Sequence, residues 1–270
     1  MAIKAVVAGA CGRMGKTICK LIFEHPEIDL VGAFEHPESP CVGKDIGPII
    51  GLPETGIKIE DDLEKVIKEA DVIIDFTFHK ASLENARKNA KYGKAMVIGT
   101  TGFSQEELSE IHELAKKHFP LVQDYNMSTG INLLCKLVEI TAKILSEGYD
   151  IEIIEAHHRM KKDAPSGTAF KLARVIAKTL GIEEDNFCFC RKGIIGERPK
   201  NQIGIQTIRG GDIVGEHTVL FAGIGERLEL THRASSRETF ARGALRAVLW
   251  VVDKKPGVYT MEDVLGLKDL

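Results

Sequence analysis

Short apolar runs alternate with helix-like stretches through the first 123 residues, and this alternation constrains the fold more than any other feature of the sequence. We expect strands at residues 3–8, 29–34, 72–76, 95–98 and 121–123. Helical spacing of apolar residues lies between them, at about 14–24, 60–69, 83–92 and 105–117, and an irregular insertion at 36–56. Continuous apolar runs are typical of parallel strands buried on both faces. The pattern therefore predicts an α/β fold with a doubly wound parallel sheet.

The pattern changes near Asn126. Two further helices are expected at 132–145 and about 168–180, with a strand at 150–155 between them. Period-2 alternation from 203 to 231 indicates more strands, and Ser236 is expected to cap a last long helix. This part predicts a second, α+β domain with an open mixed sheet, largely antiparallel, and a surface suited to oligomer formation. We expect residues 1–127 and 242–270 to form a dinucleotide-binding domain and 128–241 a substrate-binding and oligomerisation domain.

Composition and charge exclude several classes of partner. The net charge of −3 offers no basis for nucleic-acid or membrane-surface binding, and no apolar run is long enough to span a bilayer. The six cysteines are scattered, which favours reduced thiols in a cytoplasmic protein and no metal site. Only Cys188 and Cys190 are close, and we expect them at alternate positions of one strand.

A glycine-rich loop, Gly9-Ala10-Cys11-Gly12-Arg13-Met14-Gly15, separates the first strand from the first helix. Gly12 and Gly15 match the last two glycines of the dinucleotide-binding fingerprint, although the first position is shifted. Glu35 ends the second strand, where a carboxylate can bind both ribose hydroxyls of NAD. The cations Arg13, Lys16 and His36 could still tolerate NADP. The alternative is an ordinary tight turn with Glu35 as a surface acid.

Polar loops follow three further strands on the same expected rim of the sheet. They are Phe76-Thr77-Phe78, Gly99-Thr100-Thr101-Gly102 and Asp124-Tyr125-Asn126-Met127. Open α/β sheets bind ligands at the carboxyl ends of their strands. We expect the amides and hydroxyls of Gly99, Thr100 and Thr101 to accommodate a nicotinamide amide, although each loop taken singly could be an ordinary connection.

The segment from Glu155 to Ala169 combines two histidines and three cations with a helix start. Ser166 is a plausible N-cap, and free amides at a helix start attract anions. A small dicarboxylate with a proton donor beside it is the expected ligand. Adjacent strand residues face opposite sides, so only one of His157 and His158 should point to the substrate. We expect Arg159 and Lys162 to be solvated.

Basic residues elsewhere in the second domain have a less definite role. Arg209, Arg233, His217 and His232 are expected to be structural or interfacial, although one of them could bind a substrate carboxylate.

Several motifs together resemble the 4-hydroxy-tetrahydrodipicolinate reductase family, formerly called dihydrodipicolinate reductases. The matching segments, from residues 3 to 265, are GACGRMG, IGTTGF, NMS, EAHHRMKKDAPSGTA, GDIVGEH, GERLELTH and ASSR. The resemblance implies a Rossmann-like nucleotide domain and a second domain whose mixed sheet builds a homotetramer. It implies NADH- or NADPH-dependent reduction of a cyclic imine dicarboxylate on the way to diaminopimelate and lysine.

The same resemblance implies roles for particular residues. His157 is implied as the proton donor and acceptor and Lys161 as the second proton donor, with His158, Gly167 and Thr168 binding substrate. Cofactor binding is implied for Gly9, Ala10, Cys11, Gly12, Arg13, Met14, Glu35, His36, Gly99, Thr100, Thr101, Asp124, Tyr125, Asn126 and Met127. His36 replaces an arginine of some members, which weakens an NADP preference, and Asp124-Tyr125 replaces smaller neutral residues.

The chemistry of the residues agrees with this assignment, while two other functions stay open. Hydride addition leaves a negative charge that a proton must neutralise, and an amine among cations, such as Lys161 beside Arg159 and Lys162, gives up its proton more readily. The alternatives are another NAD(P)-dependent dehydrogenase acting on an amino-dicarboxylate and a non-catalytic NAD-binding regulator. The first would not turn over the condensation product of aspartate semialdehyde and pyruvate. The second would not turn over cofactor at all.

Overall fold

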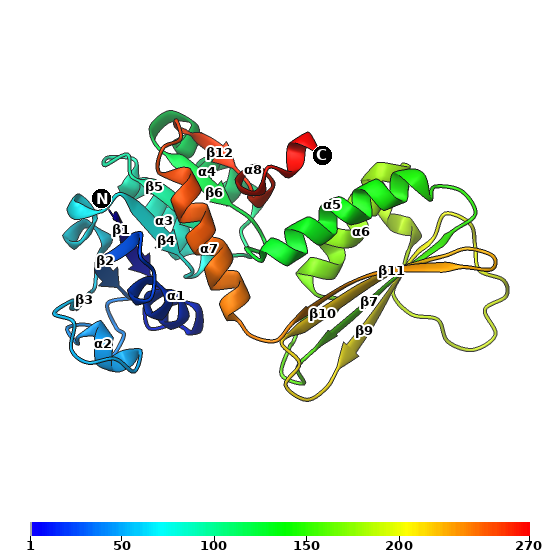
Figure 1. Ribbon diagram of the computed structural model, residues 1–270, viewed down its shortest axis with the longest axis horizontal. Helices are drawn as coiled ribbons and strands as arrows, with labels where there is room; N and C mark the ends of the chain where they lie inside the picture. Colours follow the sequence, from blue (N-terminus) through cyan, green and yellow to red (C-terminus); the bar gives the residue numbers. More distant parts are fainter. Residues whose placement is uncertain (1) are drawn as a thin grey trace. The chain divides into compact units, whose positions relative to one another are not determined.

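Two sheets organise the chain, each in its own unit, as the computed structural model shows for residues 2–270 (Figure 1). Unit 1 comprises Met1–Thr129 and Arg237–Leu270, and unit 2 comprises Gly130–Ser236. The second boundary falls before helix α7 (Glu238–Val251) and not within it at residue 242. The whole of α7 belongs to unit 1, because its apolar face packs into the core of that unit.

The sheet of unit 1 has seven strands in the order β12-β6-β5-β4-β1-β2-β3. All of its pairs are parallel, which confirms the expected doubly wound α/β fold. The strands are β1 (Ile3–Ala8), β2 (Ile28–Phe34), β3 (Ile59–Glu60), β4 (Val72–Asp75), β5 (Ala95–Ile98), β6 (Pro120–Gln123) and β12 (Gly257–Tyr259). The helices are α1 (Arg13–Phe23), α2 (Ile46–Ile49), α3 (His79–Asn89), α4 (Gln105–His118), α7 and α8 (Met261–Leu265).

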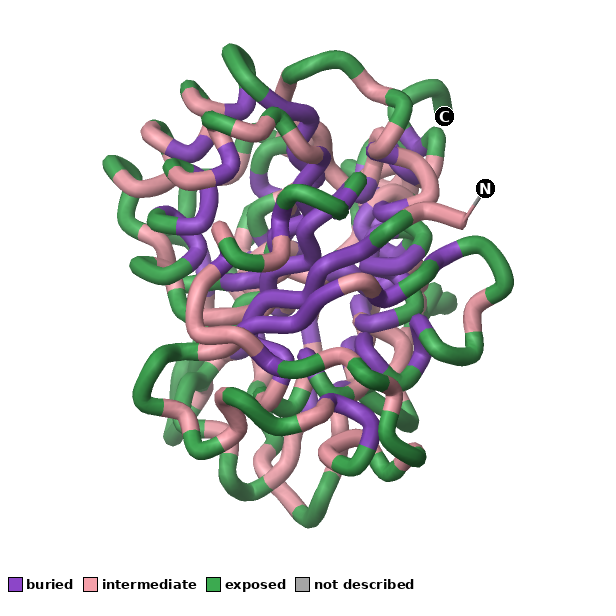
Figure 2. The backbone as a smooth tube through the Cα atoms, turned by 90° about the vertical axis from the view of Figure 1, so that its left-hand side faces the viewer, coloured by how far each residue is buried: buried purple, intermediate pink, exposed green. Residues whose placement is uncertain are grey.

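Successive residues of the central strands face two different helix layers. Ala5 and Val7 of β1 pack with apolar side chains of α1 and α7, whereas Val6 and Ala8 pack with those of α3 and α4. Figure 2 shows the strands of this sheet buried in the middle of the view. Burial on both faces explains why these strands are continuous apolar runs in the sequence.

Two expected elements of unit 1 differ from the structure. The helix expected at 60–69 is instead the end of β3 and two short 3-10 turns, Leu63–Lys65 and Ile67–Glu69. A 3-10 turn rises further per residue than an α-helix, which suits a short connection between two strands. Helix α3 begins at His79, earlier than expected. No capping side chain marks this start, so it could not be predicted from a capping residue.

Unit 2 contains a five-stranded sheet in the order β11-β10-β7-β9-β8. Its strands are β7 (Asp150–His157), β8 (Phe187–Cys188), β9 (Ile203–Arg209), β10 (Gly215–Ala222) and β11 (Arg227–Ala234). The pairs of β10 are antiparallel and the pairs of β9 are parallel. The mixed sheet is therefore confirmed, with its longer pairings mostly antiparallel, and the parallel pairs arise because the chain crosses over through a helix between β7 and β8.

Two helices, α5 (Thr129–Ile144) and α6 (Gly167–Leu180), cover one face of the unit 2 sheet (Figure 1). Side chains from both helices form one core with Ile151 and Ile153 of β7 and Val219 and Phe221 of β10. Residues two apart on β7 therefore point towards the helices, and Glu155 continues this series.

Two local expectations in and beside unit 2 are corrected. Ser236 is not the N-cap of α7, because the chain is already helical at Arg237, which makes no side-chain cap. Cys190 lies beyond β8, which ends at Cys188, so the two cysteines do not share a strand.

Within residues 2–270, none of the helices has the length and apolar character of a membrane span.

Candidate active site

The glycine loop of unit 1 packs tightly against the start of α1. Gly9 has a φ of +71°, and its carbonyl accepts a hydrogen bond from the amide of Gly12 at 3.0 Å. A Cβ atom at Gly15 would lie 2.1 Å from the Gly9 oxygen, so only glycine permits this approach. The first turn of α1 carries no acidic residue and no capping side chain. Its free amides suit a negatively charged group such as a pyrophosphate.

Glu35 is held against the glycine loop. Its Oε2 accepts a hydrogen bond from the Cys11 amide at 3.0 Å, and its Oε1 accepts one from the His36 amide at 3.1 Å. Each carboxylate oxygen can accept a further hydrogen bond. The carboxylate is thus oriented before any ligand arrives, at the end of β2 where a ribose would lie in a dinucleotide site.

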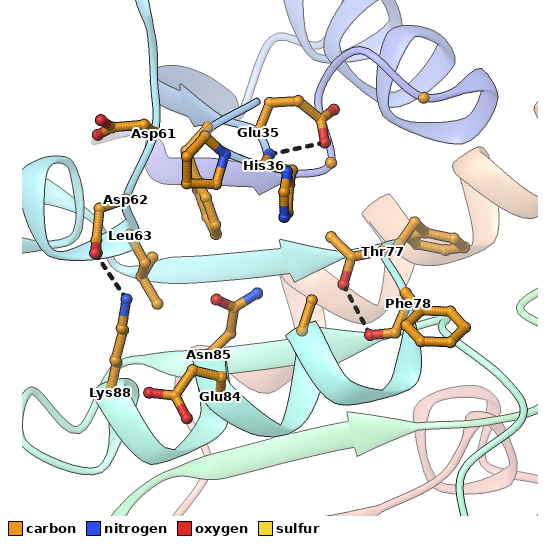
Figure 3. A pocket seen from close by; sticks show the side chains of 16 residues that line it. Glu35, His36, Asp61, Asp62, Leu63, Thr77, Phe78, Glu84, Asn85 and Lys88 are labelled. Atoms are coloured by element: carbon orange, nitrogen blue, oxygen red, sulfur yellow. Dashed lines mark hydrogen bonds and ion pairs between the residues drawn. The ribbon is translucent and has the colours of Figure 1, made fainter. Parts of the chain in front are cut away.

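A pocket of about 460 Å³ opens beside this loop (Figure 3). Glu35 and His36 lie on one side of it and Asn85 of α3 on the other. Its wall is mostly apolar, with Phe34, Leu63, Phe76, Phe78 and Ala81 among the lining residues. An apolar pocket with a few fixed polar groups beside a helix start fits the adenosine half of a dinucleotide.

The loops after β4 and β5 are joined through a buried carboxylate, that of Asp75. Its oxygens accept hydrogen bonds from the hydroxyls of Thr77, Ser82 and Thr100 and from the amide group of Asn85, at 2.7–3.1 Å. The Thr100 hydroxyl is therefore engaged within the protein. Only the backbone of this loop and the exposed Thr101 face outwards. The Phe76 ring fills the space beside Gly99, where a Cβ would lie 2.2 Å away.

The segment after β6 divides its residues between the interior and the surface. Asp124 and Met127 are buried, and Asp124 Oδ2 accepts a hydrogen bond from the amide of Met261 at 3.3 Å. Tyr125 is 65% exposed. Of the residues expected here to bind cofactor, Asp124 and Met127 thus contact the C-terminal helices of unit 1 with their side chains.

The second group of expected residues surrounds Glu155, whose side chain is fully buried on β7. Its Oε2 lies 2.6 Å from His157 Nδ1, and Arg209 donates to both of its oxygens at 2.8 Å. Oε1 also accepts from the Ser166 amide at 3.0 Å and the Thr207 hydroxyl at 3.2 Å. Five hydrogen bonds therefore converge on one carboxylate.

This environment decides the ionisation of Glu155. Burial alone would raise its pKa, but the hydrogen bonds from His157, Arg209 and the Ser166 amide outweigh burial and lower the pKa to about 2. Glu155 is therefore ionised at neutral pH and can only accept hydrogen bonds. It follows that His157 Nδ1 carries a proton and donates it to Glu155.

His217 of β10 packs against His157 on the same face of the sheet. The two rings meet edge to face with centroids 5.2 Å apart, and His217 Nε2 lies 3.1 Å from Ser166 Oγ. Burial, followed by the charge of His157, lowers the pKa of His217 to about 3. The ring is therefore neutral at pH 7, which corrects any expectation that it binds a carboxylate as a cation.

Lys161 stands on a turn that other backbone groups hold in place. The amide of Arg159 donates to the Gly211 carbonyl at 3.1 Å, and the Gly210 amide donates to the His157 carbonyl at 3.0 Å. Lys161 Nζ lies 2.9 Å from Asp163 Oδ2. The charged group paired with Lys161 is thus a carboxylate, which corrects the expectation that its electrostatic neighbours are the cations Arg159 and Lys162. Arg159 and Lys162 are exposed to solvent, as expected.

The start of α6 lies next to this turn in the sequence and in the hydrogen-bond network. Ser166 caps the helix, its Oγ accepting from the Ala169 amide at 3.2 Å. A Cβ at Gly167 would meet no atom within 4 Å, so the helix start is sterically open there. His158 lies one residue beyond the end of β7, so the alternation of a regular strand does not decide its direction.

The expected residues thus fall into two groups, one in each unit. In unit 1, Gly9, Gly12, Glu35 and His36 line one pocket, whereas the expected residues after β5 and β6 lie further along the sheet and do not line it. The unit 2 group is His157, Lys161 and the start of α6. The sequence did not single out Glu155 or Arg209 as partners of His157. The available signal was that Glu155 and His157 are two residues apart on one strand, which places their side chains on the same face of the sheet. Arg209 lies opposite His157 only through the register of β7 and β9.

Comparisons with known proteins agree over almost the whole chain. Residues 3–127 match the family model described as dihydrodipicolinate reductase, N-terminus, and residues 130–265 match the one described as dihydrodipicolinate reductase, C-terminus. A protein of Syntrophobacter fumaroxidans named 4-hydroxy-tetrahydrodipicolinate reductase is 55% identical over 98% of this chain and 100% of its own length. One of the same name from Desulfotalea psychrophila is 54% identical, with 99% of each chain covered.

Solved structures show the same relationship. A dipicolinate-bound dihydrodipicolinate reductase from Paenisporosarcina sp. TG-14 matches with a TM-score of 0.78 and 25% identity, over 96% of this chain and 98% of that one. An amine dehydrogenase from Mycobacterium smegmatis, at 15% identity and a TM-score of 0.64 over 97% and 96% of the two chains, shares the fold alone. On the matches of both halves and the identity to full-length relatives, the chain belongs to the dihydrodipicolinate reductase family, whose members are NADH- or NADPH-dependent oxidoreductases.

Proposed function

We propose that this protein reduces 4-hydroxy-tetrahydrodipicolinate to tetrahydrodipicolinate with NADH or NADPH, as a step of diaminopimelate and lysine biosynthesis. The family membership supports this reaction. The observation that carries it in the structure is a histidine held at 2.6 Å by a buried carboxylate, which also bonds the first residues of an open helix start. A proton donor and an anion site are thereby linked through one group.

The nicotinamide cofactor supplies the hydride when it is bound. Its adenosine half would occupy the pocket beside the glycine loop, with the pyrophosphate held at the start of α1 and the ribose hydroxyls by Glu35. Gly9, Ala10, Cys11, Gly12, Arg13 and Met14 would hold the pyrophosphate side, and His36 would lie beside the ribose. Glu35 disfavours a 2′-phosphate, which favours NADH, whereas the cations Arg13, Lys16 and His36 could still tolerate NADPH.

The remaining cofactor residues serve the nicotinamide half. Backbone groups of Gly99, Thr100 and Thr101 would hold the nicotinamide amide, together with the loop of Asp124, Tyr125, Asn126 and Met127. The buried network around Asp75 supports this role, because it holds the backbone of the first loop rigid.

His157 and Lys161 handle the proton. Loss of the 4-hydroxyl group of the substrate as water leaves a conjugated imine. Hydride addition to this imine leaves a negative charge on the ring, and a positioned acid must neutralise it. His157 exchanges this proton through Nε2, since Nδ1 is engaged with Glu155. Lys161 is the second donor, and its ion pair with Asp163 keeps its ammonium group in place.

The start of α6 binds a substrate carboxylate. Gly167 and Thr168 offer backbone amides beyond the Ser166 cap, and His158 contacts the substrate from the same loop. The dipicolinate bound to the reductase from Paenisporosarcina sp. TG-14 is a dicarboxylate, which supports a dicarboxylate ligand here.

The protein works as a cytoplasmic homotetramer. The open face of the unit 2 sheet supports subunit association, because it presents apolar side chains such as Ile208, which is 50% exposed. The six free cysteines suit a reducing compartment.

A coupled assay tests the function. The synthase that condenses aspartate semialdehyde with pyruvate generates the substrate in place, and the loss of absorbance at 340 nm follows NADH or NADPH oxidation. Failure to oxidise either cofactor would refute the proposal. We expect His157→Ala and Lys161→Ala each to lower kcat by about 10²–10⁴, the usual scale for lost acid–base catalysis. Normal turnover in both variants would remove these two residues from the mechanism.

A further inference from the structure

Glu155 connects the elements that carry the proposed functional groups of unit 2, two of them directly and the third through Arg209. It accepts from His157 Nδ1 at 2.6 Å and from the Ser166 amide, next to Gly167 and Thr168, at 3.0 Å. It is paired with Arg209, whose Nη2 also donates to the Asp163 carbonyl at 2.7 Å. Through Arg209, Glu155 is therefore also connected to the turn that carries Lys161.

The bond to His157 decides which ring nitrogen can meet a substrate. An ionised carboxylate has no proton to donate, so it selects the tautomer with hydrogen on Nδ1. Nε2 is then the nitrogen that exchanges a proton. Nε2 lies beside Gly215 of β10, where a Cβ atom would come within 3.1 Å of it.

An uncharged amide could not replace this carboxylate. Five hydrogen-bond donors converge on the two oxygens of Glu155, and glutamine has one oxygen with which to receive them. The amide nitrogen of glutamine could also donate to Nδ1 and so select the opposite tautomer. In a serine protease triad, replacing the orienting carboxylate by its amide costs about 10⁴ in kcat for this reason.

We propose that Glu155, clamped by Arg209, is a positioning residue for the reduction, which sets the tautomer of His157 and holds the Lys161 turn and the α6 start in register with it. This inference rests on the proposed function for its kinetic part. Its structural part, the tautomer of His157, can be measured without any substrate.

The same strand supplies a matched control. Glu152 of β7 is also a part-buried carboxylate paired with arginines, Arg191 at 2.7 Å and Arg198 at 3.3 Å. It lies on the opposite face of the sheet from Glu155 and bonds no histidine in the part of the chain that the structure describes. Loss of its charge should disturb the fold about as much, but not the tautomer of His157.

The experiment compares Glu155→Gln with Glu152→Gln in three measurements: thermal unfolding, steady-state kinetics, and ¹⁵N NMR of the histidine rings at pH 8. The His157 signals are identified by their loss in His157→Gln. We expect Glu155→Gln to lower kcat by about 10²–10³ with little change in the KM for the nicotinamide cofactor. The Nδ1–H signature of His157 should be lost in Glu155→Gln and retained in Glu152→Gln, whose kcat should stay within about threefold of wild type.

Three results would overturn the inference. The first is an Nε2–H tautomer of His157 in the wild type, which needs no variant to fold. The second is equal kcat in the two glutamine variants. The third is a loss of kcat in Glu155→Gln without a change of tautomer. If Glu155→Gln does not fold, Glu155→Asp keeps the charge but shortens the side chain, and it should retain the Nδ1–H signature while lowering kcat. Absence of NADH and NADPH oxidation by the wild type would instead refute the proposed function alone.

Discussion

His217 makes the stability of this protein depend on pH below about 6.5. Its side chain is 3% exposed, and burial followed by the charge of His157 lowers its pKa from 6.5 to about 3. Below pH 6.5 the unfolded chain therefore binds a proton at this position, whereas the folded protein does not until about pH 3. Stability from His217 is thus present above pH 6.5 and is lost as the pH falls towards 3.

The size of the effect follows from the two pKa values. Each pH unit within the window removes about 1.4 kcal/mol, so the loss between pH 7 and pH 5 is about 2 kcal/mol. This figure hardly depends on the folded value as long as that lies well below 5. Glu155 contributes little in the same interval, because its pKa is lowered from 4.5 to about 2 and its share is lost only as the pH falls from about 4.5.

The perturbation is His217→Gln, compared with wild type by urea unfolding at pH 7 and pH 5. The variant should be the less stable protein at pH 7, and its disadvantage should shrink by about 2 kcal/mol at pH 5, because glutamine does not titrate. Circular dichroism follows both units, and the fluorescence of Trp250, the only tryptophan, follows unit 1. His118→Gln, at an exposed histidine of α4, controls for the substitution itself.

A difference between wild type and His217→Gln that stays the same at pH 7 and pH 5 would refute the reasoning. It would mean that the folded protein protonates His217 as readily as the unfolded chain does. A widening difference would reverse the sign and require a charged partner that stabilises the imidazolium.

Two further predictions concern the helix starts of the two candidate sites. Ser166→Ala should lower the free energy of unfolding by about 1 kcal/mol, because the Ala169 amide loses its cap at 3.2 Å, and Ser166→Thr should restore most of it in a urea titration. Gly15→Ala should weaken NADH binding about tenfold or more in a fluorescence titration, because its Cβ would lie 2.1 Å from the Gly9 oxygen and must displace α1 from the loop. Gly210→Ala, whose Cβ would meet nothing within 4 Å, should bind NADH as wild type does, and equal affinity in both alanine variants would contradict the argument.

Local sequence was a sufficient guide where a structure depends on neighbours along the chain. The strands of unit 1 were predictable because burial on both faces demands continuous apolar residues. The glycine loop was predictable because Gly9 has a positive φ and Gly15 has no room for a Cβ atom, and only glycine meets both conditions easily. The helix at 60–69 was not, since the apolar spacing of Leu63 and Ile67 fits a 3-10 connection as well as an α-helix.

The candidate site of unit 2 was only half visible in the sequence. His157, Lys161 and the cap Ser166 lie within ten residues of one another, so one contiguous motif was enough to predict them. Lys161 was assigned the wrong electrostatic neighbours, because its ion pair with Asp163 depends on how the turn folds back. A run of charges in a sequence does not say which of them face one another.

The sequence by itself determined the α/β class, the position of the glycine loop and the family, because these depend on periodicity, on glycine and on motifs that are contiguous in the chain. Only the tertiary structure decided that Arg209 clamps Glu155, because the parallel register of β7 and β9 brings together residues 54 positions apart. It also decided that His217 is neutral and that Glu155 is charged, although both are buried. The reason is that burial penalises either charge, and only Glu155 has enough hydrogen-bond donors around it to offset that penalty.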